Sequence, residues 1–381
     1  MRLAAAAMFF AMLAAASSAR ADAPLKMRVV TWNVWGVPLI TPAREARMAE
    51  IPAALSALEP DVVCLQELWE VRDAESVAKD LGARGLVHSR RFEGPGGRTG
   101  LFVASKWALG EARFRPFSLG RRPHSLWHLD WLVEKGFAEG TVRTPAGELR
   151  LENTHLQAQY RTDQYGAERL AQAAELVLGG RERLADALLV AGDFNGHGDE
   201  LPRRVIRDLG ELEDASPSSS EDTLYVRGGR DSSLRVHAAK TALAEAFRLP
   251  SGETLPLSDH AAVVVDLELS RCSNCERSRR VASATRSAAV QSLERAADGT
   301  PFRVILAVLT ALSLLVFGVG LARRGGSLAR GSRRRVGLRV LALAMLGAGF
   351  IWCTYLAAFY YPARATELRR IADELGRASA R

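Results

Sequence analysis

Five short polar stretches, each at the end of an apolar run, contain the residue types that can cleave a phosphate ester. In chain order they are Thr31-Trp32-Asn33, Leu65-Gln66-Glu67, Thr154-His155-Leu156, Gly192-Asp193-Phe194-Asn195 and Ser258-Asp259-His260. Such hydrolysis needs ligands for a metal ion, a base for the attacking water and donors that support the developing charge. Because the apolar runs are typical of strands, we expect the polar side chains to gather at strand ends.

Two of these stretches supply hard oxygen ligands, and a third supplies a base. Glu67 and Asn33 suit Mg²⁺, which takes few protein ligands and keeps waters of its own; Mn²⁺ is an alternative. His260 is the candidate general base, because the carboxylate of the preceding residue, Asp259, can orient an imidazole and favour its charged form.

The remaining stretches supply groups that hold the phosphate. His155 can donate a hydrogen bond to a phosphate oxygen, and Asp193 and Asn195 alternate along an extended segment, so both face the same side. Each motif alone has a structural explanation: D-x-N often caps a turn, and an isolated histidine is more often structural. Their joint occurrence in this order favours a catalytic site.

Charge divides the chain into two parts. Residues 22–270 carry 30 Lys and Arg against 37 Asp and Glu, whereas residues 271–381 carry 19 against 6. The net charge of +8 therefore belongs to the C-terminal part. A nuclease more often presents a basic face to its polyanionic substrate, so the acidic balance of the first part makes nucleic acid an unlikely partner.

The two ends of the chain indicate export and membrane anchoring. Residues 1–21 read as a signal peptide, with an apolar run over 3–16 and small residues before a cut after Ala21; an uncleaved anchor is the alternative. Residues 304–322 and 340–361 contain no charge and are each long enough to span a bilayer as a helix, although buried soluble helices are the alternative. Seven arginines between them predict a cytoplasmic loop, which places the catalytic part and the polar tail, 362–381, on the exported side.

The residues between signal and anchor suffice for one domain with a full core. Over residues 22–270 apolar runs typical of strands alternate with helical patterns at 44–58, 74–81 and 164–178. This pattern fits an α+β four-layer sandwich of two mixed sheets packed face to face, with helices outside. Residues 271–303 read as a linker, and their C-x-x-C pair, Cys272 and Cys275, lacks the other two ligands of a zinc site, which leaves a disulfide or no function open.

The chain resembles the endonuclease/exonuclease/phosphatase superfamily, and within it the neutral sphingomyelinases. The resemblance covers about residues 27–269 and rests on WNVWGVPL at 32–39, DVVCLQELW at 61–69, DW at 130–131, KGF at 135–137 and NTHLQAQY at 153–160. It implies a DNase I-like sandwich, a membrane phospholipid substrate and Mg²⁺-dependent hydrolysis of sphingomyelin to ceramide and phosphocholine.

The resemblance also implies a role for each site residue. Glu67 is expected to be the principal metal ligand, with Asn33 beside it, and Asp193 and Asn195 are expected to orient the water and the phosphate. His260, positioned by Asp259, is the expected base, and His155 is expected to stabilise the phosphate in the transition state. Substrate contacts are expected from three further residues, Lys135, Gln157 and Tyr160.

One position departs from the family pattern, and two other functions stay open. Members commonly carry Arg-x-Asp in the strand before the Asp-His pair, whereas here Arg235 is followed by His237 at the expected aspartate. An exported metal-dependent nuclease of the same superfamily is the first alternative. A catalytically inactive membrane receptor is the second, which the intact set of polar residues argues against.

Overall fold

The structure is a computed structural model that describes residues 23–120, 122, 128, 133–160, 165–180, 187–217, 220–272, 275, 282–323 and 333–378. The signal peptide expected at 1–21 and most of the basic loop between the apolar helices lie outside these residues. The chain divides into two compact units, residues 1–286 and 287–381.

The first six-stranded sheet, sheet A, is built around a parallel pair. Its strands, in spatial order, are β11 (Ser232–Ala242), β14 (Ala262–Arg271), β1 (Leu25–Asn33), β2 (Val62–Gln66), β4 (Gly97–Ser105) and β3 (His88–Gly94). Strands β1 and β2 run parallel and are joined through helix α2 (Arg44–Ala57), whereas the other neighbours are antiparallel. Parallel strands need such a crossover, since a tight turn joins only antiparallel ones.

The second sheet, sheet B, repeats this plan without any repeat in the sequence. Its spatial order is β5 (Ala108–Pro116), β6 (Gly136–Thr144), β7 (Gly147–His155), β8 (Ala187–Asp193), β10 (Asp222–Arg227) and β9 (Glu213–Asp214). Strands β7 and β8 form its parallel pair, and helix α4 (Gly166–Gly180) lies in their crossover. Each sheet therefore contains one strand–helix–strand unit whose strand ends point the same way.

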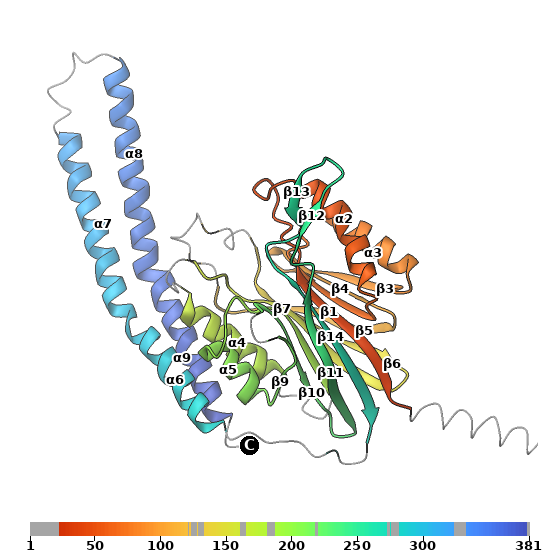
Figure 1. The fold of residues 1–381 in the computed structure, drawn as a ribbon. Coiled ribbons are helices and arrows are strands. Elements are labelled where there is room, and N and C mark those ends of the chain that lie inside the picture. The colour runs from red at the N-terminus through yellow and green to blue at the C-terminus, as the bar shows by residue number, and fades with distance from the viewer. Residues whose placement is uncertain are drawn as a thin grey trace, which may run out of the picture. The chain divides into compact units, whose positions relative to one another are not determined.

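The two sheets pack face to face with helices outside, which confirms the predicted four-layer sandwich (Figure 1). The core between the sheets is formed by apolar side chains of both, among them Val29, Cys64, Leu151 and Leu189, all buried. Helices α2 and α3 (Val71–Ala83) cover the outer face of sheet A, where a second apolar cluster lies. Helices α4 and α5 (Leu201–Arg204) lie beside sheet B (Figure 1), and the π-helix η3 (Val205–Leu209) continues α5 and contacts α4.

A polar contact joins the sheets within this core. The Gln66 Nε2 donates to Asn153 Oδ1 at 2.7 Å, and the Asn153 Nδ2 donates to the backbone carbonyls of Leu65 and Phe102. All four residues are buried, so these bonds satisfy groups that would be costly to leave unpaired and set the lateral position of one sheet against the other.

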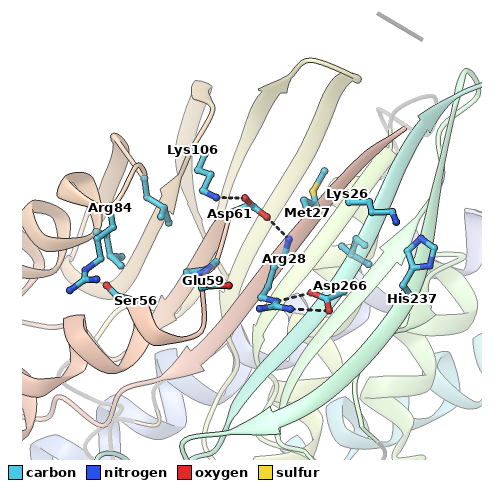
Figure 2. Close-up of a pocket in the computed structure, with 14 residues that line it drawn as sticks. Lys26, Met27, Arg28, Ser56, Glu59, Asp61, Arg84, Lys106, His237 and Asp266 are labelled. Atoms are coloured by element: carbon cyan, nitrogen blue, oxygen red, sulfur yellow. Dashed lines mark hydrogen bonds and ion pairs between the residues drawn. The ribbon is translucent and has the colours of Figure 1, made fainter. Parts of the chain in front are cut away.

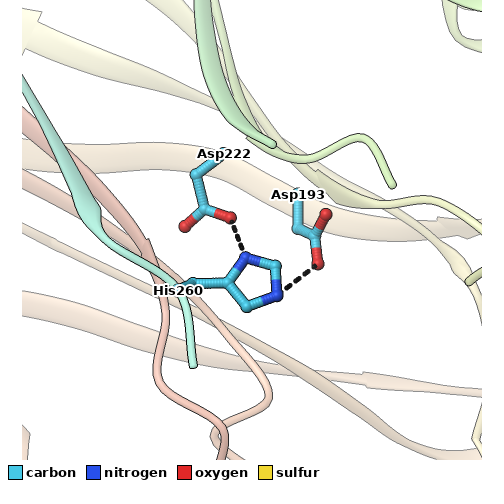
Figure 3. A group of neighbouring side chains, drawn as sticks. All are labelled: Asp193, Asp222 and His260. Carbon is cyan, nitrogen blue, oxygen red and sulfur yellow. Dashed lines mark hydrogen bonds and ion pairs between the residues drawn. The ribbon is translucent and has the colours of Figure 1, made fainter. Parts of the chain in front are cut away.

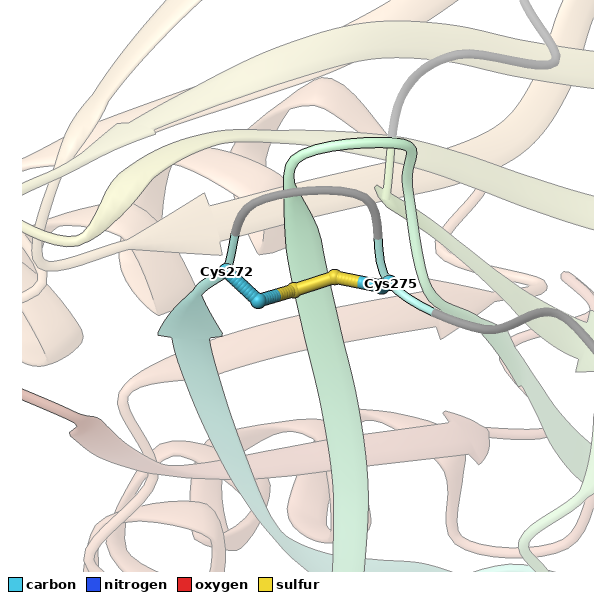
Figure 4. Close-up of a disulfide and its surroundings, with 2 residues drawn as sticks. All are labelled: Cys272 and Cys275. Carbon is cyan, nitrogen blue, oxygen red and sulfur yellow. A yellow bond between two sulfur atoms is a disulfide. The ribbon is translucent and has the colours of Figure 1, made fainter.

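Two smaller features extend the sandwich. Strands β12 (Ala246–Arg248) and β13 (Thr254–Pro256) form a separate hairpin between β11 and β14. At the other end of β14, Cys272 and Cys275 are joined by a disulfide (Figure 4). Their backbone N–H groups donate to Asp231 and Arg230, so the disulfide lies against the loop before β11.

The second unit is helical. Helix α6 (Ser283–Asp298) leads into it, followed by α7 (Thr300–Arg323), α8 (Arg333–Tyr355), the π-helix η5 (Leu356–Tyr360) and α9 (Tyr361–Arg377). Two continuous helical stretches, Ser283–Arg323 and Val336–Arg377, are long and apolar enough to cross a membrane. Large apolar side chains such as Leu309, Phe317 and Ile351 are exposed on them, as expected of helices that face lipid.

Candidate active site

The parallel strand pairs bring the predicted residues to one edge of the sandwich. In sheet A, Asn33 pairs with Gln66, so the end of β1 lies beside the residue that precedes Glu67. In sheet B, His155 pairs with Asp193 in the same way. Because the carboxyl ends of parallel strands share one edge, each crossover unit delivers two polar groups from distant parts of the chain.

The side chain of Asn33 connects the two sheets at this edge. Its Nδ2 donates to Glu67 Oε1 at 3.1 Å and to Asp193 Oδ2 at 2.9 Å. His155 Nε2 lies 3.3 Å from the same Asp193 oxygen. The turn that holds Asp193 is closed by the backbone N–H of Asn195, which donates to Asp193 Oδ1 at 2.8 Å. Three of the predicted residues, Asn33, His155 and Asn195, thus contact Asp193 directly.

Glu67 sits in an unusual backbone position, and a glycine lets the neighbouring loop pack closely against it. Its φ is +59°, in the left-handed region that is disfavoured for residues with a Cβ. The loop after β1 packs directly on it: a Cβ at Gly36 would lie 2.3 Å from the Glu67 carbonyl oxygen. The close approach explains the glycine in this loop.

The imidazole of His260 is oriented by Asp222, an aspartate that the sequence did not single out (Figure 3). His260 Nδ1 donates to Asp222 Oδ1 at 2.8 Å, which leaves Nε2 facing Asp193 Oδ2 at 3.9 Å and Glu221 Oε2 at 3.7 Å. The expectation that Asp259 orients His260 is therefore wrong, although the charge of Asp259 does contribute to the raised pKa of that imidazole. The described hydrogen bond of the Asp259 carboxylate is instead with Ser258 Oγ, at 3.4 Å.

Asp222 is held from both sheets. It starts β10, where it pairs with Asp193 in the antiparallel register, and its Oδ2 accepts the backbone N–H of Asn33 at 2.6 Å. The residue is buried, and it follows a loop rich in Ser and Glu rather than a recognisable motif. The available signal was an acidic residue two positions before the apolar run Leu224-Tyr225-Val226.

His237 does not take part in the site. It lies on β11 and contacts Glu268 at 3.3 Å, in a groove of about 810 Å³ at the opposite end of sheet A (Figure 2). In this groove Arg28 pairs with Asp266, and Lys106 pairs with Asp61 (Figure 2).

Burial and neighbouring charges set the protonation of the site. Burial lowers the pKa of His260, but the charges of Asp193 and Asp222 outweigh it and raise that pKa above its ordinary value. Burial raises the pKa of Asp193, but His155 and His260 outweigh it and lower that pKa. Burial raises the pKa of Glu67 to about 7, against the opposing charge of Lys135 and the hydrogen bond from Asn33.

The residues present fit a divalent metal ion. Glu67 Oε2 is buried and has no hydrogen-bond partner within the described part of the chain, which is costly for a carboxylate unless a cation binds it. Asp193, Asp222 and His260 also offer donor atoms within 4.8 Å of one another (Figure 3). Both oxygens of Asp222 already accept hydrogen bonds, from His260 and Asn33, so we favour Glu67 with Asn33 as the metal side.

The three predicted substrate contacts lie in different settings. Lys135 is buried at the start of β6, close enough for its charge to act on Glu67. Gln157 is also buried, and its backbone N–H donates to Gln172 at 2.8 Å. Tyr160 stacks on His128, with ring centroids 3.9 Å apart. The Asp130-Trp131 pair of the family pattern lies outside the described residues.

This arrangement and the sequence define the class of protein. The chain belongs to the Endonuclease/Exonuclease/phosphatase family, whose model matches residues 30–261. It is 32% identical over 196 residues to inositol phosphosphingolipids phospholipase C of Schizosaccharomyces pombe, covering 50% of this chain and 46% of that protein. It is 29% identical over 195 residues to sphingomyelin phosphodiesterase 2 of Homo sapiens, with the same coverage.

The solved structures agree with this assignment at the level of the fold. Sphingomyelinase C from Streptomyces griseocarneus is similar with a TM-score of 0.51 and 20% identity, covering 64% of this chain and 99% of that one. By contrast, the chain spans about half the length of the curated relatives it matches.

Proposed function

We propose that this chain is a membrane-anchored phosphoric diester hydrolase that cleaves sphingomyelin, or a closely related sphingolipid, between ceramide and the phosphate. The observation that carries the proposal is the Asn33 side chain, which bridges Glu67 and Asp193 beside His155 and the His260–Asp222 pair. The relatives named for phosphosphingolipid and sphingomyelin hydrolysis support the substrate class.

In this proposal Glu67 and Asn33 hold Mg²⁺. When bound, the cation would neutralise the phosphate and offset the carboxylate charge that keeps His260 protonated. The unpartnered Glu67 Oε2 supports this assignment, as does the preference of Mg²⁺ for oxygen ligands.

The protein's own groups perform the proton transfers. His260 removes a proton from the attacking water through Nε2, while Asp222 accepts the Nδ1–H and fixes the tautomer. Asp193 and Asn195 orient the water and the phosphate, and His155 donates to a phosphate oxygen as its charge grows. Lys135, Gln157 and Tyr160 are proposed to contact the lipid headgroup or to shape its pocket.

We further propose that residues 304–361 anchor the domain, residues 1–21 export it, and the catalytic part lies on the outer face of the membrane. The two apolar helical stretches and the arginine-rich segment between them support this topology.

The test is hydrolysis by the detergent-solubilised full chain of sphingomyelin, inositol phosphoceramide, phosphatidylcholine and DNA, each with Mg²⁺ or EDTA. Release of the phosphorylated headgroup from a sphingolipid, abolished by EDTA, is the expected result. Cleavage of DNA without lipid turnover would be consistent with the proposed metal site but would refute the proposed lipid substrate. A matched His260→Ala preparation serves as the control for contaminating activity.

A further inference from the structure

Two aliphatic side chains stand in solvent on the loop that follows the first catalytic strand. Leu39 is 102% exposed and Ile40 is 57% exposed. Single exposed apolar residues are common on soluble proteins, but two adjacent ones at the tip of a loop form a projecting apolar surface.

The loop holds these side chains outward. Arg47 is fully buried and donates to the carbonyls of Trp35, Pro42 and Leu257 at 3.0, 2.9 and 2.6 Å. Leu39 itself has a φ of +69°, a conformation that is disfavoured for a residue with a Cβ. A loop tied at several backbone positions cannot fold its apolar tip onto the domain.

The projecting tip belongs to the catalytic end of the sandwich. In the described part of residues 23–286, five large apolar side chains are exposed: Leu39, Ile40, Val71, Val87 and Phe247. Leu39 and Ile40 follow β1, and Val71 begins α3 shortly after Glu67. Phe247 lies in β12, within the segment between β11 and β14 that leads to His260. Val87 precedes β3 at the other end, since His88 pairs with Ser105 and Ser105 with Val62.

The segment that leads to the apolar helices leaves sheet A at the end opposite the catalytic edge. Strand β14 begins just after His260 and ends at Arg271, where the chain leaves the sheet. Its 10 residues extend over about 33 Å. The catalytic edge is therefore separated, along β14, from the point where the chain leaves the sheet, so a lipid contact at the catalytic edge has to come from the loops of that edge.

We propose that Leu39 and Ile40 insert into the boundary between headgroups and acyl chains of the bilayer that contains the substrate. This inference rests on the proposed function and adds the surface by which the site reaches its lipid. Aliphatic side chains on a short tip suit insertion into a lipid boundary. A protein partner is less suited, because a specific interface buries about 800 Å² on each side and about 20–30 residues.

Hydrolysis of one lipid in two physical forms tests the proposal. Full-length wild type, the double variant Leu39→Asp/Ile40→Asp and the control Val87→Asp are reconstituted into phosphatidylcholine vesicles. Each is then given long-chain sphingomyelin in the same bilayer, or short-chain sphingomyelin as a soluble monomer. We expect the double variant to lose at least about tenfold on the bilayer substrate, with the soluble rate unchanged. Val87→Asp should change neither rate.

A second readout does not depend on turnover. Ile40→Cys and Val87→Cys are each labelled with an environment-sensitive fluorophore in a Cys353→Ser background, in which Cys64 is buried and Cys272 and Cys275 are joined. Spin-labelled lipid should quench the label at position 40 and leave the label at position 87 unquenched.

Two results overturn the inference: equal losses on both substrates, or unchanged rates together with an unquenched label at position 40. Absence of sphingolipid hydrolysis by the wild type would instead refute the proposed function. In that case the quenching experiment at position 40 would by itself show whether this loop contacts the membrane.

Discussion

Replacing the candidate metal ligand Glu67 with glutamine should make the metal-free protein more stable and remove its response to Mg²⁺. Glu67 is half-buried, its Oε2 is buried with no partner among the described residues, and burial raises its pKa from 4.5 to about 7. The folded state therefore binds the proton more tightly than the unfolded state. The resulting penalty on folding begins near pH 4.5 and is complete above pH 7.

The pKa gives the size of the effect. A rise from 4.5 to about 7 corresponds to a penalty of about 3 kcal/mol at pH 8. Glutamine removes the charge but adds an N–H donor whose loss of solvation costs about 1 kcal/mol. We therefore expect Glu67→Gln to raise the free energy of unfolding by about 2 kcal/mol in EDTA at pH 8, with little gain at pH 5.

The assay is urea unfolding of the full chain in detergent, followed by tryptophan fluorescence, at both pH values with EDTA or Mg²⁺. Mg²⁺ at 100 times its Kd should stabilise the wild type by about 2.7 kcal/mol and the variant hardly at all. Glu75→Gln, on the exposed face of α3, is the control for a change of surface charge. A variant no more stable than wild type in EDTA at pH 8 would refute the burial argument. Equal stabilisation of both proteins by Mg²⁺ would refute the ligand assignment.

Three further substitutions test the other parts of the site. His260→Ala should lower sphingolipid hydrolysis by about 10²–10⁴-fold with an unchanged circular dichroism spectrum, and a loss below tenfold would count against the base role. Asp222→Asn removes the charge hydrogen-bonded to His260, so NMR titration should show a lower pKa for that imidazole; an unchanged titration would contradict the pairing. Gly36→Ala places a Cβ 2.3 Å from the Glu67 carbonyl, which should cost about 1–3 kcal/mol in urea unfolding and weaken Mg²⁺ binding. Gly82→Ala, in α3 with open space around the added Cβ, should instead be neutral or stabilising by about 1 kcal/mol, and similar effects of the two changes would refute the steric reasoning.

Several elements could be predicted because their residues follow the period of the local structure. Strand β2, which precedes Glu67, and strand β8, which ends at Asp193, are nearly continuous apolar runs, since both of their faces are buried. Strands β1 and β7, which end at Asn33 and His155, alternate polar and apolar residues over part of their length. Strand β3 was not predicted, and a strand at β11 was implied only by the resemblance, because most of the side chains of these two strands are exposed and both lack an apolar run. Their pairing partners, rather than their own sequence, stabilise them as strands.

The residue types of the site could be predicted from the sequence, but the contacts between those residues could not. The identity of the groups at strand ends predicted hard ligands, a base and phosphate donors, because those chemical roles depend on residue type. Which carboxylate orients His260 depends on register between strands far apart in the chain, and Asp222 reaches it only through the pairing of β10 with β8. The neighbour in sequence, Asp259, was the natural choice and the wrong one.

The sequence by itself determined the family, the order of the reactive residues and the presence of two apolar helical segments, because motifs and uninterrupted apolar runs are local properties. Only the tertiary structure decided that Asn33 joins Glu67 to Asp193, that His237 lies at the far end of sheet A, and that Leu39 and Ile40 project beside the catalytic edge. These facts depend on strand register, burial and the direction of loops. All three are set by packing between segments that the chain order keeps apart.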